Sequence, residues 1–157
     1  MNPPGRPRGE PPSAEGGGSP IGPRPWPSGA ATARARILVV EETKRLLHAL
    51  LQLVAAVPGV EVIGSAGSPE EAALQVELLA PELVLIDWRL PRGGGEASCR
   101  LIRARPVPPR IVALLNEDGD ADRASAAAAG TDAMLGKGRL SEALLPLLDE
   151  LFPVRRA

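Results

Sequence analysis

The sequence has one cysteine, one histidine and almost no net charge. The lone Cys99 cannot form a disulfide within the chain, and no Cys/His cluster has the ligand spacing of a zinc site. Eighteen basic and 19 acidic side chains give a formal net charge of -1, so charge provides no overall reason to bind nucleic acid or an anionic membrane. We therefore expect neither of these as a partner.

Long apolar segments are also missing. The amino terminus lacks the apolar core of a signal peptide, and no apolar run approaches the length that spans a bilayer. These absences predict a soluble, cytoplasmic protein. Residues 1–35 contain nine prolines and seven glycines and cannot bury enough surface to offset the entropy of ordering them. The sequence thus predicts a disordered Pro/Gly-rich tail over 1–35 and one domain over 36–153.

Residues 36–153 alternate between short apolar runs, typical of strands buried on both faces, and segments with helical spacing of apolar residues. Five strand–helix units in this order predict a doubly wound α/β fold, with a five-stranded parallel sheet and helices on both faces. Pro146 inside the last helical segment predicts a kinked or split helix. The strands are predicted at 37–40, 60–64, 83–86, 111–115 and 133–135, and the helices at 44–57, 69–80, 96–104, 121–129 and 141–152.

Charged side chains follow three of the predicted strands. Glu41 and Glu42 follow the first strand, Asp87 the third and Lys137 the fifth. In such sheets, ligands bind beyond the carboxyl ends of the strands. Crowded carboxylates repel each other unless a cation lies among them, which favours a hard metal such as Mg2+. A carboxylate there can attack a phosphoryl group while the metal and the lysine neutralise charge on its oxygens.

Three stretches, ILVVEE (37–42), LVLIDWRLP (83–91) and AGTDAMLGK (129–137), resemble the signature blocks of response-regulator receiver domains. The resemblance covers roughly residues 36–152. It implies a flavodoxin-like strand order of 2-1-3-4-5 and a role in a two-component phosphorelay. It also implies that Asp87 accepts a phosphoryl group from a histidine kinase or a phosphotransfer protein.

The same resemblance implies roles for the other residues at the strand ends. Glu41 and Glu42 stand at the acidic pair that, with Asp87, binds Mg2+ in the family. Arg89 would offer its backbone carbonyl to the metal, and Lys137 would contact the phosphoryl group. Mg2+ is therefore the expected cofactor.

The sequence departs from the family pattern at several positions. Glu42 is longer than the usual aspartate by one methylene, about 1.5 Å. Leu115 replaces the Ser or Thr that follows the phosphoryl group, and it can donate no hydrogen bond. Met134 replaces the aromatic residue that moves with that hydroxyl. These departures leave open an alternative, a degenerate receiver that acts as a phosphorylation-independent protein-interaction module. Pro91 and Gly95, by contrast, match the loop after the phosphoacceptor.

Enzymatic activity is not expected. No second acid lies two residues after Asp87, and no Gly-rich phosphate loop follows Val40, which argues against a small hydrolase or a nucleotide binder on a similar sheet. The sequence ends just after the fifth helix, which predicts a stand-alone receiver that signals through protein contacts. A homodimer through the face of the fourth and fifth helices is one possibility.

Simpler structural roles stay open for the site residues. An aspartate at a strand end often caps the next turn, which is the alternative role for Asp87. Glu41 and Glu42 would also suit the first turn of a helix, where the dipole favours acids. Lys137 has the alternative of being a solvated loop lysine.

Three further residues are assigned no chemistry. His48 falls on the polar side of the first helix, and Cys99 is predicted to be a small buried apolar side chain. Trp88 would cover the site, contact a partner or, like many exposed aromatic residues, do neither.

Overall fold

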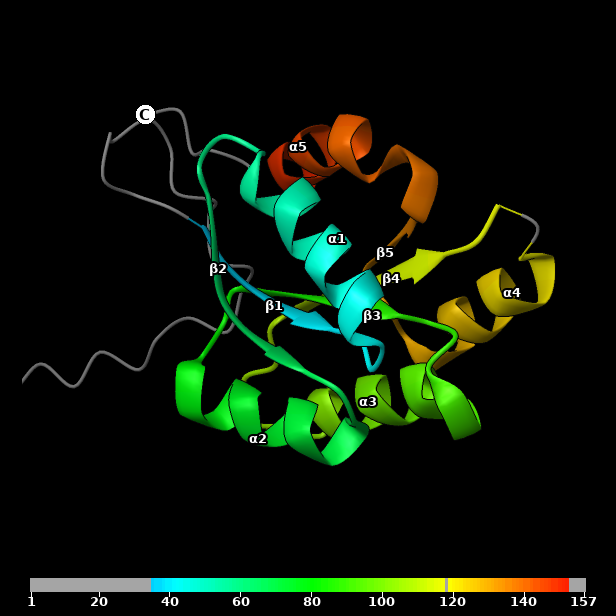
Figure 1. The fold of residues 1–157 in the computed structure, drawn as a ribbon. Helices are drawn as coiled ribbons and strands as arrows, with labels where there is room; N and C mark the ends of the chain where they lie inside the picture. Colours follow the sequence, from blue (N-terminus) through cyan, green and yellow to red (C-terminus); the bar gives the residue numbers. More distant parts are fainter. Residues whose placement is uncertain (1–34, 118, 153–157) are drawn as a thin grey trace, which may run out of the picture.

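The computed structural model describes residues 35–117 and 119–152, in which five strands alternate with five α-helices (Figure 1). The predicted tail lies outside the described residues, apart from Ala35. In the described part of the chain, no helix is long and apolar enough to cross a bilayer. The elements are β1 (Ala35–Val40), α1 (Lys44–Ala55), β2 (Val60–Ala66), α2 (Pro69–Leu79), β3 (Leu83–Asp87), the 3-10 turn η1 (Pro91–Gly93), α3 (Gly94–Arg103), β4 (Arg110–Leu115), α4 (Asp120–Ala129), β5 (Ala133–Gly136), the 3-10 turn η2 (Lys137–Arg139) and α5 (Leu140–Leu151).

The strands form one parallel sheet in the order β2-β1-β3-β4-β5, as the resemblance implied. Figure 1 shows α1 and α5 on one side of the sheet and α2 and α3 on the other. Successive residues of a strand point to opposite faces, so the buried strands supply both layers of the core. In β1, Ile37 and Val39 pack with α1 and α5, whereas Leu38 and Val40 pack with α2 and α3.

Local signals account for the ends of α2. Ser68 is the N-cap, and its Oγ accepts a hydrogen bond from the Glu71 amide at 3.2 Å. The Glu71 carboxylate in turn accepts from the Gly67 amide at 3.0 Å, one residue earlier than in a standard capping box. The helix ends at Ala80, which has a left-handed backbone just before Pro81.

Pro146 does not split the last helix, so that prediction was wrong in this respect. A single helix, α5, runs through Pro146 from Leu140 to Leu151. Leu140, Leu144 and Leu148 are buried against the sheet. We attribute the continuity to this packing, which compensates for the backbone hydrogen bond that proline cannot donate.

Predictions about single side chains had mixed outcomes. His48 is exposed and Cys99 is buried, as expected. The Cys99 Sγ lies 3.5 Å from the carbonyl oxygen of Ala129, and burial raises the pKa of the thiol. Helical spacing of the leucines in this segment places Leu46 on the apolar face of the first helix, but it is 48% exposed, because that face is centred on Leu50 and Val54.

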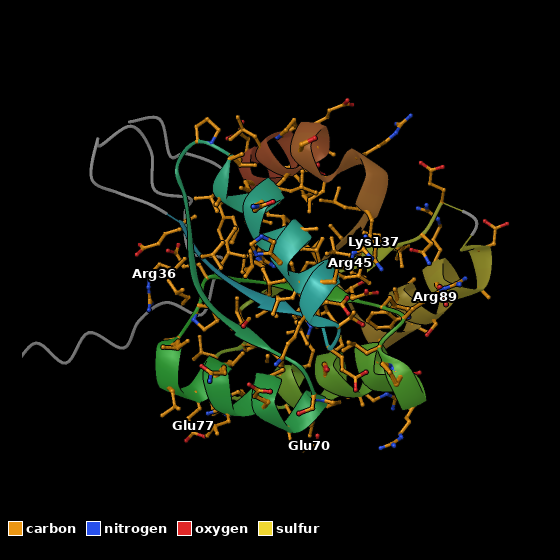
Figure 2. The ribbon with its side chains drawn as sticks, in the orientation of Figure 1. Arg36, Arg45, Glu70, Glu77, Arg89 and Lys137 are labelled. Atoms are coloured by element: carbon orange, nitrogen blue, oxygen red, sulfur yellow. The ribbon has the colours of Figure 1, made fainter. Side chains whose placement is uncertain are left out.

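Polar side-chain contacts join the elements at the amino edge of the sheet. Asp132, just before β5, accepts from Arg103 at 2.5 Å, from Arg110 at 3.2 Å and from the Ile111 amide at 2.7 Å. At the start of β1, Arg36 (Figure 2) donates to the carbonyl of Leu79, the last residue of α2, at 2.5 Å and to that of the following Ala80 at 2.9 Å. Side chains thus connect β1 with α2, and α3 with the strands β4 and β5.

Candidate functional site

Asp87 is the last residue of β3, at the carboxyl edge of the sheet, and is only 3% exposed. The Lys137 Nζ lies 2.6 Å from its Oδ2, and the Arg89 amide donates to its Oδ1 at 3.0 Å. In Figure 2, Lys137 and Arg89 lie at the same edge of the sheet. The structure thus brings the predicted acid and lysine into direct contact across 50 residues of sequence.

The Asp87 carboxyl is held in its ionised form. Burial alone would raise its pKa, but hydrogen bonds involving Glu41 and Lys137, the charge of Lys137 and the Arg89 amide together lower it. An ionised carboxylate is the form that can act as a nucleophile. At neutral pH, Asp87 is therefore negatively charged.

Glu41 is the second buried acid, 4% exposed at the end of β1. Its Oε1 accepts a hydrogen bond from the Thr43 amide at 3.0 Å. Its Oε2 is buried without a hydrogen-bond partner among the described residues. Burial, and then the neighbouring Asp87 carboxylate, raise the pKa of Glu41 from 4.5 to about 7. Of these two acids, Glu41 is therefore the one that binds a proton first as the pH falls.

Glu42 lies apart from this pair. It is exposed and lines a groove of about 320 Å³ between the loops that follow β1, β2 and β3. Over residues 35–117 and 119–152, no three His, Cys, Asp or Glu side chains are spaced to hold a metal ion. The predicted metal set of Glu41, Glu42, Asp87 and the Arg89 carbonyl therefore stays a prediction, of which the structure pairs Glu41 and Asp87.

The two buried carboxyls are nonetheless suited to Mg2+. The unpartnered Oε2 of Glu41 is a hard oxygen donor beside the ionised Asp87. Mg2+ retains several waters and commonly uses only one or two protein carboxylates together with substrate phosphate. Glu41 and Asp87 fit that requirement without Glu42.

The family model described as response regulator receiver domain matches residues 37–148. The chain belongs to this family. Receiver domains of the family generally bind Mg2+ in an acidic pocket and interact with histidine kinases or phosphotransfer proteins. The described sheet order and the contact between the buried Asp87 and Lys137 agree with this membership.

Curated relatives match this receiver domain along part of their length. A protein-glutamate methylesterase/protein-glutamine glutaminase from Anaeromyxobacter dehalogenans is 31% identical over 117 residues, which are 74% of this chain and 32% of the relative. One from Rhodospirillum rubrum is 29% identical, covering 70% of this chain and 31% of the relative. The chain thus spans about a third of the curated relatives it matches. Their names are those of enzymes, whereas the receiver family itself is non-enzymatic.

Solved receivers have the same fold. The response regulator domain of Thermotoga maritima CheB matches with a TM-score of 0.67 and 22% identity, covering 78% of this chain and 99% of that domain. A LuxR-family regulator from Aurantimonas sp. SI85-9A1 matches with a TM-score of 0.68 and 26% identity, covering 76% of this chain and 86% of the other.

The altered positions of this receiver are apolar in the structure as well. Leu115 ends β4 and is 1% exposed, and Met134 in β5 is half-buried against the same side of the core. Neither side chain can donate a hydrogen bond to a group on Asp87. The relay that the resemblance predicts at these two positions would therefore have no polar side chain.

Two contacts beside the site were missed by the sequence analysis. Trp88 is buried, only 5% exposed, and its indole Nε1 donates to the Ser125 Oγ at 3.2 Å. The Arg89 Nε donates to the Asp122 Oδ2 at 2.7 Å. The only signal in the sequence was the spacing of Asp122 and Ser125, which puts both on one face of an alanine-rich helix.

Proposed function

We propose that this receiver domain accepts a phosphoryl group on Asp87 from a cytoplasmic histidine kinase or phosphotransfer protein and signals through protein contacts. The observation that carries the proposal is the buried, ionised Asp87 carboxylate with the Lys137 Nζ 2.6 Å from its Oδ2. A carboxylate held only as a turn cap would not need an ammonium group in direct contact with it. The output surface in this proposal is the face of α4, β5 and α5, where a second copy could also bind.

In the proposed reaction, a phosphoryl group moves from a histidine nitrogen of the donor protein to a carboxylate oxygen of Asp87. An Asp87 oxygen forms a bond to phosphorus while the bond from phosphorus to the donor histidine nitrogen breaks, and the electron pair returns to the imidazole. The product is an acyl phosphate on Asp87. Lys137 would neutralise charge on the transferred oxygens. A Mg2+ ion held by Glu41 and Asp87 would supply further charge neutralisation when bound.

Asp87→Asn is expected to abolish phosphorylation. With Mg2+ and acetyl phosphate, intact-mass measurement should show one added phosphoryl group on the wild type and none on the variant, because the amide is not a nucleophile. Asp149→Asn, the same change at an exposed position on α5, should leave the adduct unchanged. A wild-type protein without an adduct would contradict the proposal.

A phosphorylation-independent interaction module is the second candidate, favoured by the apolar Leu115 and Met134. It predicts that a partner co-purified with the full chain binds wild type and Asp87→Ala with the same affinity, with or without acetyl phosphate. Our proposal predicts instead that acetyl phosphate changes the affinity of the wild type only. Isothermal titration calorimetry on both proteins distinguishes the two candidates.

A further inference from the structure

Helix α4 has little apolar anchorage to the rest of the domain. Of its ten residues, all of them described, only Ala126 is buried. The small methyl group of alanine contributes little hydrophobic stabilisation compared with a larger apolar side chain. Its neighbour α3, also ten residues long, buries the larger apolar side chains of Cys99 and Ile102. Polar side-chain contacts are therefore important for holding α4 against the rest of the domain.

Two of those contacts come from the residues immediately after Asp87. The Trp88 indole donates to Ser125 at 3.2 Å, and the Arg89 guanidinium donates to Asp122 at 2.7 Å. Asp122 and Ser125 are three residues apart and share one face of α4. Figure 2 shows Arg89 beside this helix. We call these two contacts the α4 tether.

The tether is also bonded to the phosphoacceptor itself. The backbone amide of Arg89 donates to the Asp87 Oδ1 at 3.0 Å, while its side chain forms the ion pair with Asp122. One residue therefore contacts both Asp87 and α4. Trp88 is likewise fixed at both ends, because its amide donates to the Leu114 carbonyl at 3.0 Å.

We propose that Arg89 and Trp88 are positioning residues that transmit the phosphorylation state of Asp87 to α4. The inference rests on the proposed function. A phosphoryl group carries up to about two negative charges, against one on Asp122, and competes for the Arg89 guanidinium. Its attachment also reduces the charge on the Asp87 oxygens that hold the Arg89 amide. The first turn of α4 then loses its ion pair, while the Trp88 contact with Ser125 holds the second turn.

This route does not need a hydroxyl at Leu115. The side chains that respond to charge are Arg89 and Asp122, both close to the surface, with exposed side-chain fractions of 53% and 25%. The pair is therefore weak enough to be exchanged. In this receiver, the signal would leave Asp87 along the loop after β3 rather than along the ends of β4 and β5.

The test uses the full chain with Trp26→Phe, which leaves Trp88 as the single tryptophan. Acetyl phosphate and Mg2+ are added, and each sample is divided for intact mass, tryptophan emission and amide hydrogen exchange. We expect the adduct to shift the Trp88 emission and to speed exchange in the first turn of α4 by about two- to fivefold, the range for one surface ion pair. Adding Asp87→Asn should remove both responses.

Two variants separate transmission from simple support of the fold. Asp122→Asn should show the faster exchange before phosphorylation, and the adduct should add no further change. Glu96→Gln, which breaks the comparable Arg100–Glu96 pair on α3, should respond as the parent protein does. An adduct without a change in α4 would overturn this inference and leave the proposed function intact. Absence of any adduct would overturn both.

Discussion

Gly95→Ala is expected to lower the free energy of unfolding by about 3 kcal/mol, at the upper end of the usual cost of an added core methyl group. A Cβ at this position would lie 2.4 Å from the Trp88 carbonyl oxygen, 2.7 Å from its Cα and 2.9 Å from its carbonyl carbon. All three are backbone atoms, so relief requires the loop after Asp87 to move away from α3. Urea denaturation followed by far-ultraviolet circular dichroism measures the loss.

Gly136→Ala provides the matched control. It lies at the end of β5, next to Lys137, and a Cβ there would have no neighbour within 4 Å. Its backbone is extended, so alanine is tolerated and slightly restricts the unfolded chain. We expect this variant to unfold within about 0.5 kcal/mol of the wild type. If Gly95→Ala were equally neutral, the close packing of α3 on the Trp88 backbone would be refuted.

The second large effect concerns pH. The folded protein keeps a proton on Glu41 up to about pH 7, whereas an unperturbed carboxyl loses it near 4.5. Between these values the folded state binds more protons than the unfolded chain, so stability falls as pH rises. Asp87, whose pKa is lowered, contributes no slope in this window, because its stabilisation is lost only at lower pH. We expect the wild type to lose roughly 2 kcal/mol between pH 5 and pH 8.

Glu41→Gln should remove this slope. The amide can still accept from the Thr43 amide and can donate to Asp87 without ionising. Urea unfolding at pH 5, 6, 7 and 8 in the presence of a chelator should therefore give a flatter profile and a more stable protein at pH 8. Glu42→Gln, a neighbouring exposed carboxylate, should retain the wild-type profile. Parallel profiles for wild type and Glu41→Gln would contradict the assignment of the proton to Glu41.

Much of the fold was predictable because parallel strands buried on both faces are continuous apolar runs in the sequence. The segment Leu83–Asp87 shows this most clearly, since every residue in it is buried. The strand order came from the resemblance to receivers and not from the pattern itself. Pro146 was misjudged because propensity is local, whereas the burial of Leu144 and Leu148 depends on the sheet beneath the helix.

The candidate site was predictable only as far as strand ends determine it. Asp87 ends β3 and Lys137 follows β5, so both lie at the carboxyl edge of the sheet, on either side of β4. Their side chains are in contact. Glu41 is buried and Glu42 is exposed, because the two side chains point to different sides of the chain after β1. Two adjacent residues of the same type give no sequence signal that tells which of them faces the site. The contact of Trp88 with Ser125 joins residues 37 apart in sequence. No local sequence pattern predicts such a pairing, because it depends on how α4 packs beside the loop after β3.

The contacts around Asp132 hold the amino edge of the sheet together. One carboxylate joins Arg103, Arg110 and the Ile111 amide at the amino edge, far along the strands from Asp87. A displacement that begins in the loop after β3 meets this anchored edge at the far side of the sheet. Helix α4 would then move at its amino-terminal turn, while its carboxyl end, where the Gly130 carbonyl accepts a hydrogen bond from Arg103, would stay in place.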